Sequence, residues 1–405
     1  MPVGLSGLPE LLPVSGVRWG VAEAAIKRPG RNDVALMEIA PDSSAAAVYT
    51  RNAFCAAPVS VAKRHGAAQA TRYLLINSGN ANAGTGAPGL QAALDSCRAV
   101  AELGHCQPEA VLPFSTGVIG EPLPLERIRR ALPQALAGLS EQGWEAAARA
   151  IMTTDIVPKG ISKQLVLNGK RVTITGIAKG SGMIRPDMAT MLAYLATDAG
   201  VAQALLQQTL RQAADRSFNS ITVDGDTSTN DACVLVATGQ AGVTFASETD
   251  AGFAEFDAAV TQVCQALAQA IVRDGEGATK FITIDVQGGR DTAECRQVAY
   301  AVAHSPLVKT AFFASDPNWG RILAAVGRAG LDGLDVDKVT LHLGDVCIAR
   351  GGGRAADYTE AAGQAVMREA EITITIALGR GSAEARVWTT DLSYDYVKIN
   401  AEYRT

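Results

Sequence analysis

Short apolar runs and longer amphipathic segments alternate along the chain. The short runs are rich in Val, Ile, Leu and Ala, which is typical of strands. The longer segments repeat their apolar positions every three or four residues, which is typical of helices packed on a core. The pattern predicts helices at Leu90–Leu103, Leu125–Ala137, Trp144–Met152, Ala202–Arg216, Ala251–Arg273, Ser305–Ala314 and Ile322–Gly327. It predicts strands at Val34–Ile39, Ala46–Tyr49, Tyr73–Ile76, Ala110–Phe114, Thr190–Ala196, Ala232–Ala237, Phe281–Val286, Val339–Leu343, Ile372–Ala377 and Ala385–Trp388.

The segment from residue 164 to residue 175 predicts a β-hairpin. Two strand-like runs, Gln164–Leu167 and Arg171–Thr175, flank the dipeptide Asn168-Gly169. Asn-Gly favours the type I′ turn, whose twist matches that of paired antiparallel strands. The following stretch, Lys179–Pro186, joins this hairpin to the next predicted strand. Its glycines and its proline are typical of a tight connecting loop.

The mixture of strands and helices predicts an α+β or α/β fold in which helix layers cover β-sheets. The chain has 405 residues, of which 48% are hydrophobic, so it can bury a large core, and its length allows two or three domains. Aromatic residues are scarce, at 5%, whereas the chain has 40 glycines. This composition predicts a core of small and β-branched side chains. No Pro- or Ser-rich linker separates independent domains.

Charge and composition exclude several classes of partner. The net charge is −5 and no long basic run occurs, so we expect no binding to nucleic acid or to anionic membranes. No apolar stretch is long enough to span a membrane, and the first twenty residues lack the pattern of a signal peptide. The seven cysteines are scattered, odd in number and without a CxxC pair, which predicts reduced thiols. We therefore expect a cytoplasmic protein.

Six polar, Gly-rich clusters follow predicted strands or lie between elements. Loops at strand ends are where binding and catalytic sites are usually assembled. Any one cluster is compatible with a simple turn, because Gly, Asn and Asp are turn formers. Six in one chain favour a composite site. They are NSGNANAGTG (77–86), STGVIG (115–120), KGSGMIRPDMATML (179–192), TVDGDTSTND (222–231), DGEGATK (274–280) and DPNWGR (316–321).

Most established site patterns are absent from the sequence. No GxxxxGK[ST] motif occurs, which excludes a phosphate-binding P-loop. The chain has four histidines and no HExxH, so neither a His-ligated metal site nor a Ser-His-Asp triad is supported. The run Asp224-x-Asp226-x-Ser228 is similar to the start of a calcium-binding loop, but it lacks the required glycine and terminal glutamate. We therefore predict no metal ion.

The triplet Met188-Ala189-Thr190 remains as a candidate for chemistry. Thr is an ordinary first residue of a strand, and a lone triplet would carry little weight. However, a tight Gly/Pro loop can hold the preceding carbonyl in a strained geometry. A threonine hydroxyl also needs a base, and its own α-amine supplies one once the preceding peptide bond is cut. An α-amine has a reference pKa of about 7.7–8.0, so a useful fraction is neutral near pH 7.

At these residues the sequence resembles the ornithine acetyltransferase (ArgJ) family of arginine biosynthesis. The segment KGSGMIRPDMATML carries the resemblance most specifically. STGVIG, VDGDTSTND, DGEGATK, DPNWGR and the terminal YVKINAEYRT support it independently, and no motif position departs from the family pattern. The matching segments run from Asn77 to Thr405, so the resemblance covers essentially the whole chain. It implies an αββα-type sandwich, shared with self-cleaving DmpA-type aminopeptidases.

The resemblance also implies an activity and a set of site residues. It implies self-cleavage between Ala189 and Thr190, giving an α chain of residues 1–189 and a β chain of residues 190–405 in a heterotetramer of two α and two β chains. The freed Thr190 would take the acetyl group of N-acetylornithine and pass it to glutamate, with no cofactor. Thr116 and Gly117 match the oxyanion-hole positions. Substrate-binding positions match Thr153, Lys179, Thr190, Glu276, Asn400 and Thr405.

The residues themselves leave alternatives open. Taken singly, Lys179 is compatible with a solvated loop lysine, Glu276 with a helix cap or a local pair, and Thr116 with a turn. A self-cleaving aminopeptidase or amidohydrolase on the same fold would share the chemistry as far as the acyl-threonine and then use water as acceptor. A non-enzymatic binding protein with Gly-rich ligand loops would remain one intact chain. Some family members accept acetyl-CoA as a donor and others only recycle acetyl groups, and no CoA-binding motif is legible here.

Overall fold

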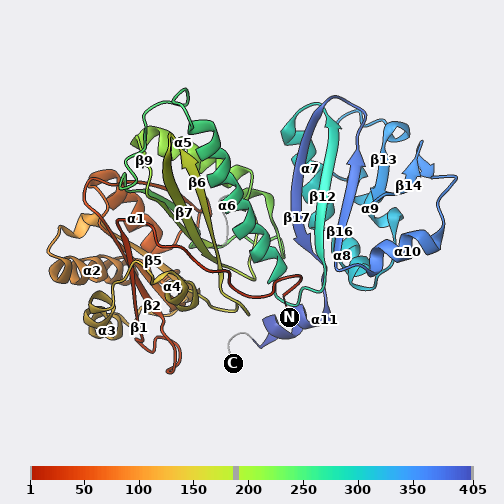
Figure 1. The fold of residues 1–405 in the computed structure, drawn as a ribbon. Coiled ribbons are helices and arrows are strands. Elements are labelled where there is room, and N and C mark those ends of the chain that lie inside the picture. The colour runs from red at the N-terminus through yellow and green to blue at the C-terminus, as the bar shows by residue number, and fades with distance from the viewer. Residues whose placement is uncertain (1, 186–190, 403–405) are drawn as a thin grey trace. The chain divides into compact units, whose positions relative to one another are not determined.

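The computed structural model describes residues 2–185 and 191–402 and divides into two compact units (Figure 1). Unit 1 comprises residues 2–6, 220–225 and 272–402. Unit 2 comprises residues 7–185, 191–219 and 226–271. The chain therefore passes between the units four times, without a Pro- or Ser-rich linker at the crossings.

Two β-sheets form the centre of unit 2. The first has the order β1-β2-β4-β5, in which β1 pairs antiparallel with β2, β2 antiparallel with β4, and β4 parallel with β5. The second has the order β3-β10-β8-β7-β6. The strands of the first sheet are β1 (Val17–Ala22), β2 (Val34–Ile39), β4 (Tyr73–Asn80) and β5 (Val111–Val118). Those of the second are β3 (Ser44–Tyr49), β10 (Ala232–Ala237), β8 (Leu192–Thr197), β7 (Lys170–Lys179) and β6 (Lys159–Leu167). A short pair, β9 (Gly200–Val201) with β11 (Thr244–Phe245), lies outside both sheets.

The two sheets pack face to face, and helices cover their outer faces. Trp19 and Phe114 of the first sheet contact Tyr194 of the second through edge-to-face ring contacts. Aromatic pairs of this kind stabilise a core by about 0.5–1.5 kcal/mol beyond the area they bury. The outer face of the first sheet packs on α1 (Ala57–Ala68), α2 (Gly86–Gly104) and α3 (Leu125–Ala137). The second sheet packs on α5 (Gln203–Asp215) and α6 (Phe253–Arg273), and α4 (Trp144–Ala150) closes the core between the sheets. Unit 2 is thus an αββα sandwich, as predicted.

Most predicted elements of unit 2 are confirmed. The bounds of β2, β10 and α3 agree with the prediction, and the hairpin of β6 and β7 turns at Asn168 and Gly169. Both turn residues have positive φ, 50° and 76°, as a type I′ turn requires. Strand β4 extends beyond the predicted Ile76 to Asn80, because pairing with β5 continues through polar residues.

The second sheet interleaves strands from both sides of the predicted cleavage point. Its order places β10 and β8, which follow residue 190, between β3 on one side and β7 and β6 on the other. Cutting the chain before residue 190 would therefore leave every ladder of this sheet in place. If the predicted cleavage occurred, backbone hydrogen bonds and the shared core would hold the two resulting chains together.

Unit 1 is built on a six-stranded sheet with helices. The strand order is β15-β14-β13-β16-β12-β17, and β12 pairs parallel with β16 and antiparallel with β17. The strands are β12 (Phe281–Gly289), β13 (Thr340–Leu343), β14 (Val346–Arg350), β15 (Gly353–Arg354), β16 (Glu371–Ala377) and β17 (Ala383–Thr390). The helices are α7 (Thr292–Ala303), α8 (Pro306–Phe313), α9 (Trp319–Gly327), α10 (Glu360–Arg368) and α11 (Tyr394–Ala401). Buried Ile, Val and Leu side chains of the sheet form one core with α7 and α9.

The sequence pattern missed several elements. β1, β14, α1, α7, α10 and α11 were not predicted. In α7 the signal was present, because Cys295, Val298, Ala299 and Val302 recur at helical spacing and are buried, and Asp291 caps the first turn. In α11 (YDYVKINA) it was absent, because none of the side chains of this helix is buried.

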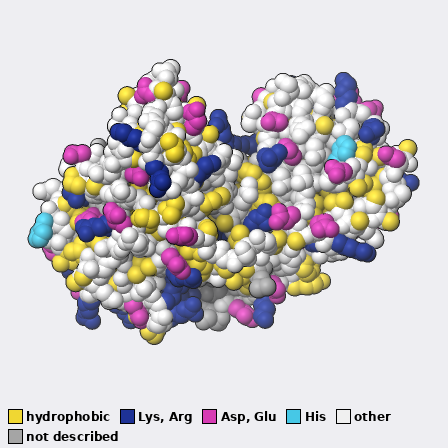
Figure 2. Space-filling view, viewed as in Figure 1, with side chains coloured by type: hydrophobic (Ala, Val, Ile, Leu, Met, Phe, Trp, Pro, Cys, Tyr) yellow, Lys and Arg dark blue, Asp and Glu magenta, His cyan; other side chains and the backbone are white. Residues whose placement is uncertain are grey.

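On the face shown in Figure 2, Lys and Arg side chains are interspersed with Asp and Glu and form no continuous basic stripe. Within the described ranges, no helix is both long and apolar enough to cross a bilayer. The seven cysteines, all of which lie in those ranges, are free thiols, as expected.

Candidate active site

Two of the Gly-rich clusters meet where parallel strands β4 and β5 end. The register pairs Ser78 with Thr116 and Gly79 with Gly117 and then shifts at Asn80. The sequence places these residues nearly 40 positions apart, and the parallel ladder brings them side by side. The predicted oxyanion residues Thr116 and Gly117 therefore lie at the carboxyl end of β5, a common place for functional groups in open sheets.

Position 117 accepts only glycine. Its φ is +133°, a conformation that other residues rarely adopt. A Cβ added there would lie 2.3 Å from the carbonyl carbon of Gly79 and 2.6 Å from the amide nitrogen of Asn80. The backbones of the two strand ends approach so closely that any side chain would separate them.

Buried asparagines hold this corner in place. Asn77 donates from Nδ2 to the carbonyl of Asn80 (2.8 Å) and accepts at Oδ1 from the Ser115 hydroxyl (2.6 Å). Asn230, from the TVDGDTSTND cluster, donates to the carbonyls of Ala81 (2.6 Å) and Ser115 (2.9 Å). All these side chains are nearly inaccessible to solvent. Because an amide fixes two partners at once, the peptide that leads into Thr116 has one defined position.

Lys179 contacts Thr116. It is the last residue of β7, and its ammonium donates to the Thr116 hydroxyl over 3.2 Å. Lys179 is only 9% exposed, so the interpretation of a solvated loop lysine is wrong. A hydroxyl that accepts a hydrogen bond from a cation becomes a better donor through its own proton. Thr116 is thus suited to donate to a developing oxyanion.

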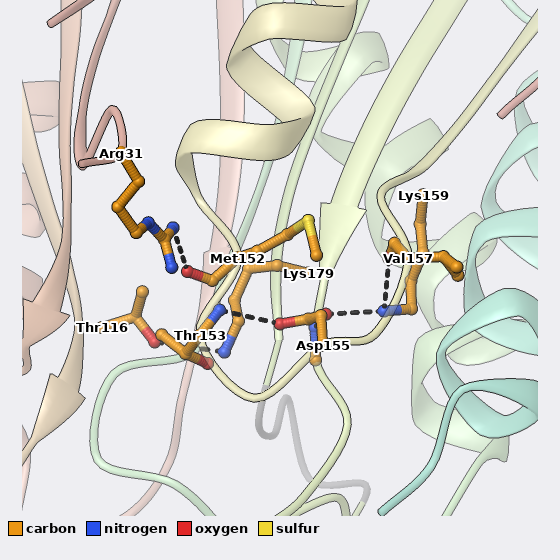
Figure 3. A network of polar contacts seen from close by, with 9 residues as sticks. Arg31, Thr116, Met152, Thr153, Asp155, Val157, Lys159 and Lys179 are labelled. Atoms are coloured by element: carbon orange, nitrogen blue, oxygen red, sulfur yellow. Dashed lines mark hydrogen bonds and ion pairs between the residues drawn. The ribbon is translucent and has the colours of Figure 1, made fainter. Parts of the chain in front are cut away.

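A carboxylate in the segment between α4 and β6 ties three parts of this region together. Asp155 accepts from the Lys159 ammonium (2.6 Å) and the Gly180 backbone N–H (2.7 Å) at Oδ1, and from the Thr153 N–H (3.0 Å) at Oδ2. Figure 3 shows Thr153, Lys179 and Thr116 on one side of Asp155 and Lys159 on the other. We call these five residues the lysine–threonine cluster.

The charge state of Asp155 follows from its neighbours. Burial alone would raise the pKa of this fully buried carboxyl. The ammonium groups of Lys159 and Lys179 and the Gly180 N–H outweigh burial and hold the pKa well below its usual range. Asp155 is therefore ionised near neutral pH.

Arg31 holds the same segment from the other side. Its Nη2 donates to the carbonyl of Ala150 (3.2 Å), the last residue of α4, and to that of Met152 (2.7 Å), just beyond the helix. It also donates to the Ser78 hydroxyl (3.3 Å). A cation at the carboxyl end of a helix is also favoured by the helix dipole. Burial and the nearby Arg28 lower the pKa of Arg31. Arg31 and Asp155 together fix Met152–Thr153, which carries a predicted substrate-binding residue.

A second group of predicted site residues lies in unit 1. The Asn400 side chain donates to Glu276 Oε2 over 2.8 Å and thereby joins α11 to the DGEGATK loop. Glu276 is 8% exposed, and its partner is an amide and not a helix terminus, so the helix-cap interpretation is wrong. A Cβ at Gly277 would lie 2.5 Å from the Tyr396 nitrogen, so the loop lies directly against α11. Asp391 fixes the far end of the loop by accepting from the N–H groups of Thr279 and Lys280.

A buried lysine of α8 contacts the two residues that precede Asp391. Lys309 Nζ donates to the Thr389 hydroxyl (3.1 Å), the Thr390 hydroxyl (3.3 Å) and the Thr390 carbonyl. Burial lowers the pKa of Lys309 from 10.5 to about 8, against the opposing effect of Asp391 and Asp224. Compared with the unfolded chain, the folded protein therefore favours the neutral amine of Lys309.

This preference predicts a pH dependence of stability. Between pH 8 and pH 10.5 the unfolded chain keeps the Lys309 proton and the folded chain has lost it, so the unfolded state binds more protons and the free energy of unfolding rises with pH. The contribution amounts to about 3 kcal/mol over this window. Urea unfolding of wild type and Lys309→Met at pH 8 and pH 10 should show the wild type gaining relative to the variant as pH rises. A difference between the two proteins that does not change with pH would contradict this assignment.

The remaining predicted site residues cannot be placed. Ala189, Thr190 and Thr405 lie outside the described residues. The predicted α and β chains are a division of the sequence and are not the two compact units, because residues from both sides of position 190 occur in each unit. Among the described residues, no group of three or more His, Cys, Asp or Glu side chains is arranged to hold a metal ion.

Sequence reasoning missed the supporting residues. Asp155, Lys159 and Arg31 were not singled out, and Asn77 and Asn230 were noticed only as members of Gly-rich, turn-like clusters. Asp155 and Lys159 are four residues apart in a segment without helical pattern, so no periodicity marked them as a pair. The DPNWGR cluster has an evident structural role, since Asn318 caps α9 and Arg321 donates to the carbonyl of Leu307.

Comparisons with known proteins agree with the motifs. Residues 18–405 match the family model described as ArgJ family. The chain is 61% identical over 407 residues to "Arginine biosynthesis bifunctional protein ArgJ" of Pseudomonas syringae pv. tomato, with 100% of both chains covered. It is similar to the crystal structure of arginine biosynthesis bifunctional protein ArgJ from Bacillus halodurans, with 38% identity, a TM-score of 0.48, and coverage of 50% of this chain and 95% of that chain. It is also similar to the crystal structure of ornithine acetyltransferase from Mycobacterium tuberculosis in complex with ornithine. The identity is 33% and the TM-score 0.38, with coverage of 43% of this chain and 93% of that chain.

Proposed function

The chain belongs to the ArgJ family, and from this membership we propose that it moves the acetyl group of N2-acetyl-L-ornithine to L-glutamate in L-arginine biosynthesis. The observation that carries the proposal is the family match over residues 18–405, which contains every motif quoted above. The protein is an acyltransferase that acts on small molecules. Its geometry supports this chemistry, because Thr116 and Gly117 stand at a rigid strand end beside a buried ammonium.

The first step would generate the nucleophile. The Thr190 hydroxyl attacks the Ala189 carbonyl, the peptide C–N bond breaks and an ester forms. Water hydrolyses that ester, which leaves a carboxylate on Ala189 and both a free hydroxyl and a free α-amine on Thr190. The new amine is the base that the hydroxyl lacked. Leu192, two residues further along the sequence, is paired in the sheet with Lys179.

The transfer itself would take two half-reactions. The Thr190 hydroxyl gives its proton to the α-amine and attacks the acetyl carbonyl of N-acetylornithine, and the C–N bond breaks as ornithine leaves with that proton. The α-amine of glutamate then attacks the acetyl-threonine ester, and the hydroxyl is restored. Both tetrahedral intermediates carry an oxyanion. Donors from Thr116 and Gly117 would stabilise it, typically by about 2.7–4 kcal/mol each.

The charges of the site suit amino-acid substrates. Lys179 would attract a carboxylate group, and Glu276, whose oxygen accepts from Asn400, would attract an ammonium group, as the family resemblance implies for these two residues. Thr153 and Thr405 complete the proposed substrate-binding set. We place the enzyme in the cytoplasm, as two α and two β chains, without a metal or cofactor.

Acetyl-CoA is the proposed second donor. Relatives that are about 60% identical over their full length carry the name bifunctional ArgJ, and a thioester would acylate Thr190 by the same attack as the amide. Acetyl-CoA would then act as a co-substrate that makes N-acetylglutamate directly. Incubation of the purified protein with acetyl-CoA and glutamate should yield N-acetylglutamate and free thiol in equal amounts.

Dependence on the acceptor tests transfer against hydrolysis. We expect the purified protein to release ornithine from N-acetylornithine continuously only when glutamate is present, and to form one N-acetylglutamate per ornithine. Without glutamate, ornithine release should stop after about one equivalent per active site, because the acetyl-threonine ester is not discharged until an amine acceptor attacks it. Fast release that is independent of glutamate would identify a self-cleaving amidohydrolase on the same fold.

A further inference from the structure

One buried hydroxyl in unit 1 contacts both elements that carry the Glu276–Asn400 pair. The Ser393 hydroxyl donates to the carbonyl of Gly277, the residue after Glu276, over 2.6 Å. The same oxygen accepts from the Tyr396 N–H over 3.4 Å and so caps the first turn of α11, the helix that carries Asn400. We propose that Ser393 is a positioning residue that holds the carboxylate of Glu276 and the amide of Asn400 in one geometry, and thereby sets the affinity of the protein for an ammonium-bearing substrate.

Helix α11 depends on polar contacts at its start for its position. The helix follows β17 in the chain (Figure 1), has eight residues, and buries none of its side chains. A helix of this length is marginal by itself in water, and most helices in proteins are stabilised by an apolar face packed on a core. Tyr394 adds one edge-to-face ring contact with Phe313, also at the first turn. Because a helix is regular, the hold on its first turn also directs Asn400 in its last turn.

The DGEGATK loop is held by the same short segment of chain. Asp391, two residues before Ser393, accepts from two backbone N–H groups at the end of the loop. The bond from Ser393 to the Gly277 carbonyl is the contact nearest to Glu276 along the chain. Ser393 is only 5% exposed, so water competes little for this bond. Ser393 acts through Glu276 and is not a catalytic residue, and its link to an ammonium-bearing substrate rests on the proposed function.

Ser393→Ala should weaken binding of N-acetylornithine more than it slows the reaction. The variant loses both the donor to the Gly277 carbonyl and the cap of α11, so Glu276 and Asn400 no longer keep a common geometry. We expect the KM for N-acetylornithine to rise about tenfold, the lower limit given by loss of one hydrogen bond to a charged group. The kcat should change by less than about threefold, because the affected carboxylate binds the substrate equally before and during the reaction.

Ser305→Ala is the matched control for the loss of a helix cap. Ser305 is also buried, and its hydroxyl caps α8 by accepting from the Val308 N–H over 3.4 Å. Within the described part of the chain, this hydroxyl makes no hydrogen bond to the DGEGATK loop. The control variant should therefore keep the KM within about twofold of wild type. If Ser393→Ala does not accumulate folded, Ser393→Gly and Ser305→Gly replace the two variants, because glycine is better tolerated than alanine at a cap.

A donor without the side-chain ammonium separates positioning from general stability. N-acetylnorvaline has the carbon skeleton of N-acetylornithine and lacks only the δ-amino group. Ser393→Ala should lower kcat/KM for N-acetylnorvaline no more than Ser305→Ala does. Intact mass should be recorded for each variant, so that the kinetic comparisons use equally cut protein. Equal losses with the two donors would overturn the proposal, because Ser393 would then only stabilise the fold.

Hydrogen exchange gives a readout that does not depend on activity. In Ser393→Ala we expect the amides of residues 274–280 and those of α11 to exchange faster together, whereas both segments should exchange as in wild type in Ser305→Ala. Unchanged exchange of either segment in Ser393→Ala would overturn the proposal even if wild type transfers acetyl groups normally. Absence of acetyl transfer in wild type would instead refute the proposed function, and the exchange rates would still decide whether Ser393 couples the loop to the helix.

Discussion

Thr190→Ala is expected to remain one uncut chain of about 42.1 kDa and to lose acetyl transfer by at least about 10⁴-fold. The variant lacks the hydroxyl that attacks the Ala189 carbonyl, and without cleavage no α-amine is released at position 190. Both the nucleophile and its base are therefore lost through one substitution. Intact mass spectrometry of freshly purified protein, followed by the transfer assay with N-acetylornithine and glutamate, measures both effects.

Thr190→Ser is the matched control for this loss. A primary hydroxyl can still attack and can still be activated by the amine beside it, so this variant should cut itself and retain part of the activity. Wild type should give two masses that correspond to residues 1–189 and 190–405, which nevertheless elute together on native gel filtration because β3, β7 and β6 share a sheet with β8 and β10. Fully active wild-type protein with an unbroken chain would overturn the proposed mechanism.

Gly117→Pro should have the second largest effect. Proline removes the backbone N–H proposed as an oxyanion donor, and loss of one such donor lowers kcat by about 10²- to 10³-fold. Proline requires a φ near −65°, which is incompatible with the φ of +133° observed at Gly117. The Cβ of proline would also clash with the Gly79–Asn80 peptide. We expect kcat to fall by at least the amount given by the lost donor, measured with saturating N-acetylornithine and glutamate.

Two further variants separate the lost donor from the distorted backbone. Gly120→Ala, in the same cluster, also has a positive φ, +85°, but its Cβ would contact nothing within 4 Å. It should cost about 1 kcal/mol of stability and leave kcat near wild type. Thr116→Val keeps the shape of the side chain and removes only the hydroxyl, so it should lower kcat by about 10²-fold with little change in melting temperature. Wild-type kcat in Gly117→Pro would refute the oxyanion assignment.

The sequence by itself determined the local structure and the chemistry of the motifs. The bounds of α3, β2 and β10 agree with the prediction. The apolar pattern of a helix or strand records only that this element is buried, so it can be recognised without knowing the element's neighbours. Asn168-Gly169 identified its turn because its positive φ values are a local property. The segment KGSGMIRPDMATML resembles one family, and the match of residues 18–405 to the model of that family confirms this resemblance.

Only the tertiary structure decided which of these residues meet. Thr116 contacts Lys179 because two sheets pack in one unit, and Gly117 must be glycine because β4 and β5 are parallel neighbours. The ion pair of Asp155 and Lys159 could not be predicted from the sequence, because it forms only when both side chains are buried in the folded protein. The spacing of apolar residues around them gives no sign of that burial. The two units also cut across the predicted chain division. Contacts over long sequence separations depend on which strands pair, and the order of strands is a property of the whole fold.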